Sequence, residues 1–236
     1  MVAASTIEAN GVSSTLARRT ILTVDKNTPF CDTVLKIMES NMADDIVKFD
    51  KILNVLCPTD PTAQKFTEWY PEYYGVKQAI VRECNPNVIV EIGVRAGYSA
   101  YSFLSACPDA IYLGFDAENG THGGAGGPFA PWAHKILKEA GFKYKIWAPF
   151  NTQEVLCLPV RGDFYHVDGD HTTDGCYHDI KMCFEDAMPG AYILIDDFDF
   201  LGDVRRAVNN FINEYSNASI PQYIKSKRGE MLIRKL

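Results

Sequence analysis

Acidic residues end two short apolar runs of the sequence, at positions where several carboxylates could act on one ion. Asp168 follows residues 164–167, and Asp196 and Asp197 follow residues 192–195. If the two runs are neighbouring parallel strands, their carboxyl ends meet at one edge of a sheet, and the three carboxylates converge. Such close negative charges repel unless a cation lies among them, and Mg²⁺ prefers oxygen ligands. The pattern predicts a divalent-metal site, although helix capping by aspartate is an alternative.

A histidine stands three residues after the first of these aspartates, at His171. A hydroxyl becomes a good nucleophile when a dication stabilises its alkoxide form. An imidazole, with an ordinary pKa near 6.5, can accept the released proton. We therefore expect Asp168 and His171 to take part in catalysis on a hydroxyl group.

A glycine turn follows the first apolar run after Pro86. It contains Gly93 and Gly97, and Glu91 takes the place of the first glycine of the dinucleotide pattern G-x-G-x-x-G. A carboxylate there repels a pyrophosphate but accepts a cation such as the methionine end of S-adenosylmethionine. Asp116 closes the next run, where its carboxylate can accept hydrogen bonds from both ribose hydroxyls. A simple tight turn and a loop cap remain the alternatives.

The elements that must position these residues alternate along the chain after residue 86, which is typical of βαβ units and a mainly parallel sheet. The predicted strands are Val88–Ile92, Ile111–Phe115, Tyr144–Ala148, Phe164–Asp168 and Ala191–Asp196, and a terminal antiparallel hairpin is predicted from Gln222–Lys225 and Met231–Arg234. The predicted helices are Ser99–Ala106, Trp132–Ala140, Gly175–Met188 and Val204–Tyr215. The fold class is thus α/β, with a doubly wound, mainly parallel, seven-stranded sheet.

The N-terminal third carries a different pattern. Apolar residues recur at helical spacing from Leu35 to Leu56, and aromatic residues gather in Trp69–Gly75. The aromatic segment is either a packed linker or a cap over a substrate pocket. We predict an N-terminal arm and helical cap over 1–75 and a catalytic domain over 76–236. The helices of the first part could also support a homo-oligomer.

Composition excludes several classes of partner. The net charge is −7 and the pI is about 5.2, which opposes binding to nucleic acid. No apolar run is long enough to cross a bilayer, so we expect no membrane partner and a cytoplasmic location. Seven cysteines without a CxxC pair agree with reduced thiols in that compartment. The expected partner is a small-molecule substrate.

From about Asn87 onward, the chain resembles the class I S-adenosylmethionine-dependent methyltransferases. The resemblance implies a Rossmann-like fold and S-adenosylmethionine as cofactor. It implies cofactor contacts at Glu91, Gly93, Gly97 and Ser99 around the methionine portion, at Asp116 for the ribose, and at Phe150 for the adenine.

More narrowly, the chain is similar to the metal-dependent O-methyltransferases of the macrocin type. The matching segments are Val167–His171, Ile195–Phe198 and Gly202–Val208. This resemblance implies Mg²⁺ ligands at Asp168, Asp196 and Asp197, and His171 as the base. It also implies methylation of a hydroxyl on a small molecule, such as a natural product, a sugar or a catechol-like diol. A nicotinamide-dependent oxidoreductase and a non-catalytic binding module are the alternatives, because a fold alone does not determine function.

Overall fold

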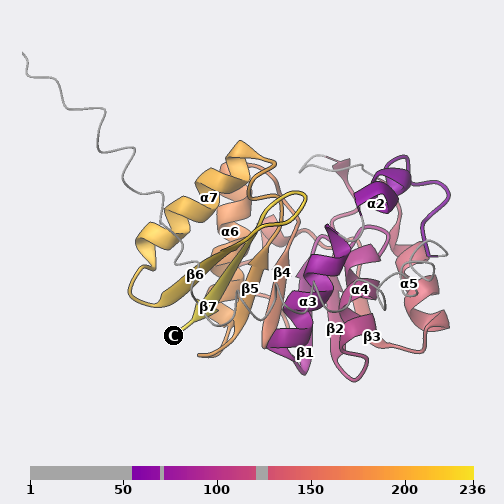
Figure 1. Cartoon of the computed structure of the whole chain (residues 1–236), viewed down its shortest axis with the longest axis horizontal. Coiled ribbons are helices and arrows are strands. Elements are labelled where there is room, and N and C mark those ends of the chain that lie inside the picture. The colour runs from indigo at the N-terminus through magenta and orange to yellow at the C-terminus, as the bar shows by residue number, and fades with distance from the viewer. Residues whose placement is uncertain (1–54, 70–71, 121–126) are drawn as a thin grey trace, which may run out of the picture.

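A seven-stranded sheet forms the centre of the protein, in the order β3-β2-β1-β4-β5-β7-β6 (Figure 1). The computed structural model describes residues 55–69, 72–120 and 127–236. The strands are β1 (Val88–Ile92), β2 (Ile111–Phe115), β3 (Lys143–Trp147), β4 (Phe164–Val167), β5 (Tyr192–Ile195), β6 (Ser219–Ile224) and β7 (Glu230–Lys235). The first five strands run parallel, and β7 lies antiparallel to both β5 and β6.

Helices cover both faces of this sheet. They are α2 (Ala63–Trp69), α3 (Tyr74–Cys84), α4 (Tyr98–Ala106), α5 (Ala130–Glu139), α6 (Thr173–Asp186) and α7 (Gly202–Glu214), with a 3-10 turn, η2 (Thr152–Glu154). Apolar residues of α3, α4 and α5 pack in one core cluster, and those of α6 and α7 pack in a second. Strands buried on both faces read as continuous apolar runs, which is why these short segments could be recognised in the sequence.

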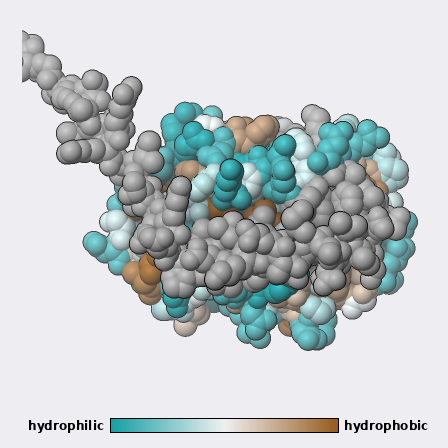
Figure 2. All heavy atoms as spheres, viewed as in Figure 1, coloured by the Kyte–Doolittle hydropathy of each residue, from teal (hydrophilic) through white to brown (hydrophobic). Residues whose placement is uncertain are grey.

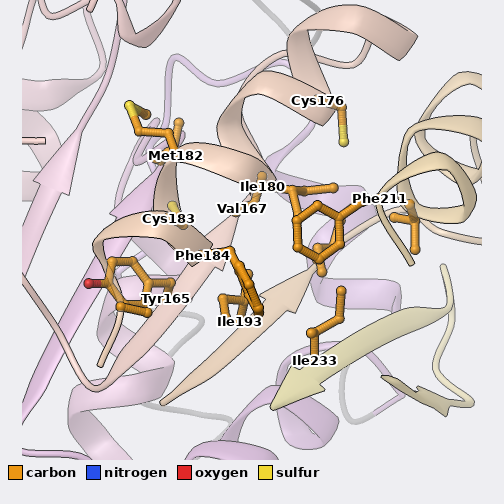
Figure 3. Close-up of a cluster of buried hydrophobic side chains, with 14 of the residues drawn as sticks. Tyr165, Val167, Cys176, Ile180, Met182, Cys183, Phe184, Ile193, Phe211 and Ile233 are labelled. Carbon is orange, nitrogen blue, oxygen red and sulfur yellow. The ribbon is translucent and has the colours of Figure 1, made fainter. Parts of the chain in front are cut away.

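The second core cluster shows how α6 and α7 are held against the sheet (Figure 3). Phe184 of α6 and Phe211 of α7 meet edge to face with their ring centroids 5.1 Å apart, and both are buried. Ile193 of β5 and Ile233 of β7 complete this cluster from below the helices. The packing fixes the carboxyl ends of β4 and β5, where the acidic residues follow.

The predicted fold class is confirmed, and the five predicted parallel strands differ from the observed ones by at most one residue at an end. The hairpin is also confirmed, with strands longer than predicted. The predicted domain boundary after residue 75 stays a prediction, and it falls inside α3. The helical face over Leu35–Leu56 lies almost wholly outside the described residues, so a homo-oligomer through it stays a prediction.

The visible surface of the described residues is mostly polar. Figure 2 shows hydrophilic side chains gathered over α7 and around α2. Among the helices that the structure describes, none is long and apolar enough to cross a membrane. A cytoplasmic location stays a prediction.

Candidate active site

A pocket of about 310 Å³ opens at the carboxyl ends of β1, β2, β4 and β5. In an open α/β sheet this edge is where ligands bind. The predicted site residues that line it are Gly93, Ser99, Asp116, Phe150, Asp168, His171 and Asp197. Glu91, Gly97 and Asp196 are predicted site residues that do not line it.

The two glycines of the turn after β1 have different roles. Gly93 has a φ of +92°, and a Cβ there would overlap the carbonyl oxygen of Asp168. Glycine thus lets the β1 and β4 loops approach each other below the pocket. Gly97 has a φ of +81° and begins α4, where an added Cβ would lie 2.9 Å from the Cβ of Ala133. Gly97 therefore permits close packing of α5 and does not face the pocket.

Asp116 is held at the end of β2 by backbone donors. Its Oδ2 accepts a hydrogen bond from the Arg95 amide at 2.6 Å, and its Oδ1 accepts one from the Glu118 amide at 2.7 Å. The carboxylate is half-buried and lines the pocket. Phe150 lies beside it, with its ring centroid 4.9 Å from that of Phe115. This arrangement offers a fixed acceptor next to an aromatic wall, which suits a nucleoside.

Glu91 lies below the pocket rather than in it. The side chain is fully buried and accepts hydrogen bonds from Ser99 and Tyr112. Its Oε1 also lies 2.7 Å from Nδ1 of His166. The role of Glu91 toward the methionine portion of a cofactor stays a prediction, and from this position it would act through its charge or through the groups that it contacts. Glu91 orients Ser99, which does line the pocket.

Asp168, His171 and Asp197 come together at the other end of the pocket. One ligand atom from each of the three lies within 4.8 Å of the others. The Nε2 atom of His171 is 3.2 Å from Oδ1 of Asp168 and 3.8 Å from Oδ2 of Asp197. Burial alone would lower the pKa of His171, but the hydrogen bond and charge of Asp168 outweigh it, together with the other carboxylates, and raise the pKa to about 9.

Asp197 is the most constrained member of this cluster. Its backbone has a φ of +60°, which is uncommon for a non-glycine residue. Burial, followed by the charges of Asp196 and Asp168, raises the pKa of Asp197 to about 8. Arg228 lies 2.8 Å from Oδ1, yet neither carboxylate oxygen has a hydrogen-bond partner of suitable geometry within the described part of the chain. Buried oxygens without hydrogen bonds beside a second carboxylate fit a hard divalent cation.

Asp196, predicted as a third metal ligand, is placed elsewhere. Its carboxylate is fully buried, accepts a hydrogen bond from Tyr73 and lies 3.1 Å from the Lys77 ammonium. Burial alone would raise the pKa of Asp196, but Lys77 and the other hydrogen-bonding and cationic groups around it together outweigh burial and hold the pKa well below its usual range. Lys77 also lies 3.4 Å from Glu230 and 2.9 Å from His166. Asp196 thus belongs to a buried charge network behind the cluster.

The aromatic segment Trp69–Gly75, predicted as a packed linker or as a cap over a substrate pocket, contributes Tyr73 and Tyr74 to the pocket lining. Other pocket residues were not identified from the sequence. Arg228, in the β6–β7 turn, lines the same end as Asp197. The glycine beside it marked a turn, but nothing in the local sequence indicated that the turn would fold over β5.

Comparison with known proteins agrees with this arrangement. Residues 90–198 match a family described as a methyltransferase domain. An O-methyltransferase from Bacillus cereus in complex with S-adenosylhomocysteine is 13% identical, with a TM-score of 0.55 over 87% of this chain and 91% of that chain. The O-methyltransferase TomG from Streptomyces achromogenes, involved in tomaymycin synthesis and solved with S-adenosylmethionine, is 17% identical. Its TM-score is 0.51, and the match covers 86% of this chain and 89% of that chain. The O-methyltransferase NovP is 15% identical, with a TM-score of 0.55 over 80% and 98%. No curated protein sequence matches the chain.

The matched residues include most of β1, all of β2, β4 and β5, and both acidic strand ends, so the match covers most of the pocket described above. The strand order and the antiparallel hairpin are those expected from the resemblance to class I methyltransferases. Residues 90–198 therefore match a methyltransferase domain, and the chain has the fold of solved S-adenosylmethionine-dependent O-methyltransferases.

Proposed function

We propose that this protein is an O-methyltransferase that methylates a hydroxyl of a small molecule with the help of a divalent cation such as Mg²⁺. The observation that carries the proposal is the placement of Asp168, His171 and Asp197 in the same pocket as Asp116. The first three can serve the acceptor, and the last can serve the donor. One pocket thus offers groups that can bind the methyl donor and groups that can act on the acceptor.

On the donor side, S-adenosylmethionine supplies a methyl group on a sulfonium. Asp116 offers its carboxylate to the ribose hydroxyls, because it lines the pocket while backbone amides fix the direction of its carboxylate. Gly93 and Ser99 line the same pocket, where they can contact the amino-acid portion. Phe150 provides an apolar wall for the base. Solved relatives with bound S-adenosylmethionine or S-adenosylhomocysteine support this assignment.

On the acceptor side, Asp168 and Asp197 would hold the cation, which would supply the Lewis acidity that makes a hydroxyl more acidic. His171 faces the same carboxylates through Nε2 and can take the hydroxyl proton there once its own proton has left. Neutralising the two carboxylates favours this, because their charge is what raises the pKa of His171. Asp196 is a positioning residue in this proposal, because Lys77 and Tyr73 hold it behind the cluster.

Alignment of the two groups accounts for much of the catalysis. Holding two reactants in attack geometry can contribute roughly 7 to 11 kcal/mol. Tyr73 and Tyr74 line the pocket and are themselves buried, so they help to exclude water from the reacting groups. A diol or catechol would suit a site that offers a cation and a base side by side.

The proposal is tested by calorimetric titration and by transfer of a labelled methyl group to catechols. We expect S-adenosylhomocysteine to bind and NAD not to bind. Mg²⁺ or Mn²⁺ should bind to the wild type and to Asp203→Asn, a surface control, but not to Asp168→Asn or Asp197→Asn. Undiminished transfer in excess chelator would exclude the metal-assisted mechanism. Binding of NAD without binding of S-adenosylhomocysteine would exclude the methyltransferase assignment.

A further inference from the structure

Arg228 is held rigidly in the turn between β6 and β7. Its carbonyl oxygen accepts hydrogen bonds from the amides of Asp199 at 2.9 Å and Phe200 at 3.1 Å. The preceding residue, Lys227, donates its amide to the Glu72 carbonyl at 2.8 Å. The turn is therefore fixed both to the loop after β5 and to the segment before α3. A binding group on a backbone fixed in this way is preorganised.

The guanidinium of Arg228 lies among aromatic rings. Its central carbon is 4.6 Å from the ring centroid of Phe200, 5.3 Å from that of Trp69 and 5.7 Å from that of Tyr73. Cation–π contact of this kind orients the planar group without using its N–H donors. The side chain remains 18% exposed, and it lines the pocket, so a ligand there can reach it.

The hydrogen-bonding capacity of this guanidinium is largely unused within the described residues. One nitrogen lies 2.8 Å from Oδ1 of Asp197, while Nε is buried and has no hydrogen-bond partner there. A guanidinium carries five N–H donors, and a buried donor without an acceptor costs free energy. The ion pair with Asp197 alone therefore does not satisfy this side chain.

The pocket contains a second arginine with a different role. Arg95 lies at the end of the pocket near Asp116, where the methyl donor is proposed to bind. Its guanidinium lies 2.6 Å from Oδ1 of Asp60, and its backbone amide donates a hydrogen bond to Asp116. Of the arginines and lysines that line the pocket within the described chain, Arg228 is the one at the acceptor end, next to Asp197. An otherwise acidic end of the pocket thus carries, beside His171, a guanidinium on a fixed backbone.

We propose that Arg228 binds a carboxylate of the methyl acceptor, so that the substrate class is hydroxylated carboxylic acids rather than neutral alcohols. This rests on the proposed function, which places the acceptor at this end of the pocket. A carboxylate matches the flat, forked donors of a guanidinium and can accept two hydrogen bonds from it. The acid would fix the acceptor at one end, while Asp168 and His171 act on its hydroxyl at the other.

The test compares acids with their neutral amides. With protein saturated with S-adenosylhomocysteine, dissociation constants are measured by calorimetry for 3,4-dihydroxybenzoate against 3,4-dihydroxybenzamide, and for 3,4-dihydroxyphenylacetate against its amide. We expect the wild type to bind at least one acid about 10- to 100-fold more tightly than its amide, as a charged hydrogen-bonded pair allows. Arg228→Gln should bind acid and amide equally. Arg234→Gln is the matched control, because Arg234 lies on β7 over the ring of Tyr192 and does not line the pocket.

Folding of each variant is checked by its melting temperature and its affinity for S-adenosylhomocysteine. If Arg228→Gln does not fold, Arg228→Lys keeps the charge but loses the planar fork, and the preference for the acid should still fall several-fold. Equal affinity of the wild type for acid and amide, including no binding of either, overturns the proposal, as does a preference that survives in Arg228→Gln. If the wild type prefers the acid but transfers no methyl group, carboxylate binding by Arg228 is supported and the proposed function is contradicted. If it transfers a methyl group but shows no preference for the acid, the proposed function is supported and carboxylate binding by Arg228 is contradicted.

Discussion

His171 should titrate in the free protein with a pKa of about 9, well above the ordinary value near 6.5 for histidine. Its Nε2 atom lies 3.2 Å from Oδ1 of Asp168, and the imidazolium is favoured by that carboxylate and by Asp197. The difference between the two pKa values corresponds to about 3 kcal/mol, at about 1.4 kcal/mol per pH unit. This is the free energy by which the pairing favours the folded state when His171 is charged.

The sign of the effect on stability follows from linkage. Because the folded protein holds the proton more tightly than the unfolded chain, the stabilisation from His171 is complete below about pH 6.5. It is lost as the pH rises through about 9. Adding Mg²⁺ should lower the pKa of His171, since a cation on Asp168 and Asp197 cancels the attraction that raises it.

The measurement uses imidazole chemical shifts across pH, assigned by comparison with His171→Gln. Urea unfolding at pH 6 and pH 9.5 gives the stability, and the wild type should lose about 3 kcal/mol more than His171→Gln between these values. His134→Gln, an exposed position on α5, is the control and should behave as the wild type. A pKa of His171 at or below 6.5 without metal would refute the reasoning.

Three further predictions concern the groups around the cluster. Asp116→Ala should weaken binding of S-adenosylhomocysteine in calorimetry by roughly 1 to 3 kcal/mol through loss of a charged acceptor, and unchanged affinity would reject the ribose role. Lys77→Met should lower the free energy of unfolding in urea by roughly 3 to 5 kcal/mol, because it leaves buried carboxylates without their cation; a loss below about 1 kcal/mol would show that the network does not depend on it. Gly93→Ala should destabilise the protein by at least about 1 kcal/mol in the same assay, since the new Cβ overlaps Asp168 at a positive φ; Gly141→Ala, also at positive φ but with open space around the added Cβ, separates the overlap from the backbone strain.

Much of the fold was predictable because its signal is local. Each parallel strand is a short apolar run, and each helix between them has an apolar face, so the strand ends and the residues after them could be placed from the sequence. Asp168 and Asp197 are brought to one pocket for that reason. His171 joins them because it follows Asp168 in the same loop.

The directions of individual side chains were less predictable. Successive residues at a strand end point in opposite directions, so Asp196 and Asp197 do not share one environment. Asp196 pairs with Lys77, which is far away in the sequence. Nothing in the sequence around Lys77 indicates that Asp196 is its partner. Glu91 likewise faces His166 and Tyr112 instead of the cofactor space, through contacts between strands that a single sequence does not reveal.

The position of β7 has a consequence for how the chain must assemble. Although β7 follows every other strand along the chain, it lies between β5 and β6 within the sheet. During synthesis one edge of β5 therefore stays unpaired until residues 230–235 have left the ribosome. An unpaired strand edge is a site where strands of other chains can pair. Removing β7 would take away an internal strand and leave β6 without a partner and one edge of β5 unpaired, whereas removing an edge strand would not interrupt the sheet. We expect a chain without β7 to aggregate during expression, whereas the loss of an edge strand would only lower the stability of the fold.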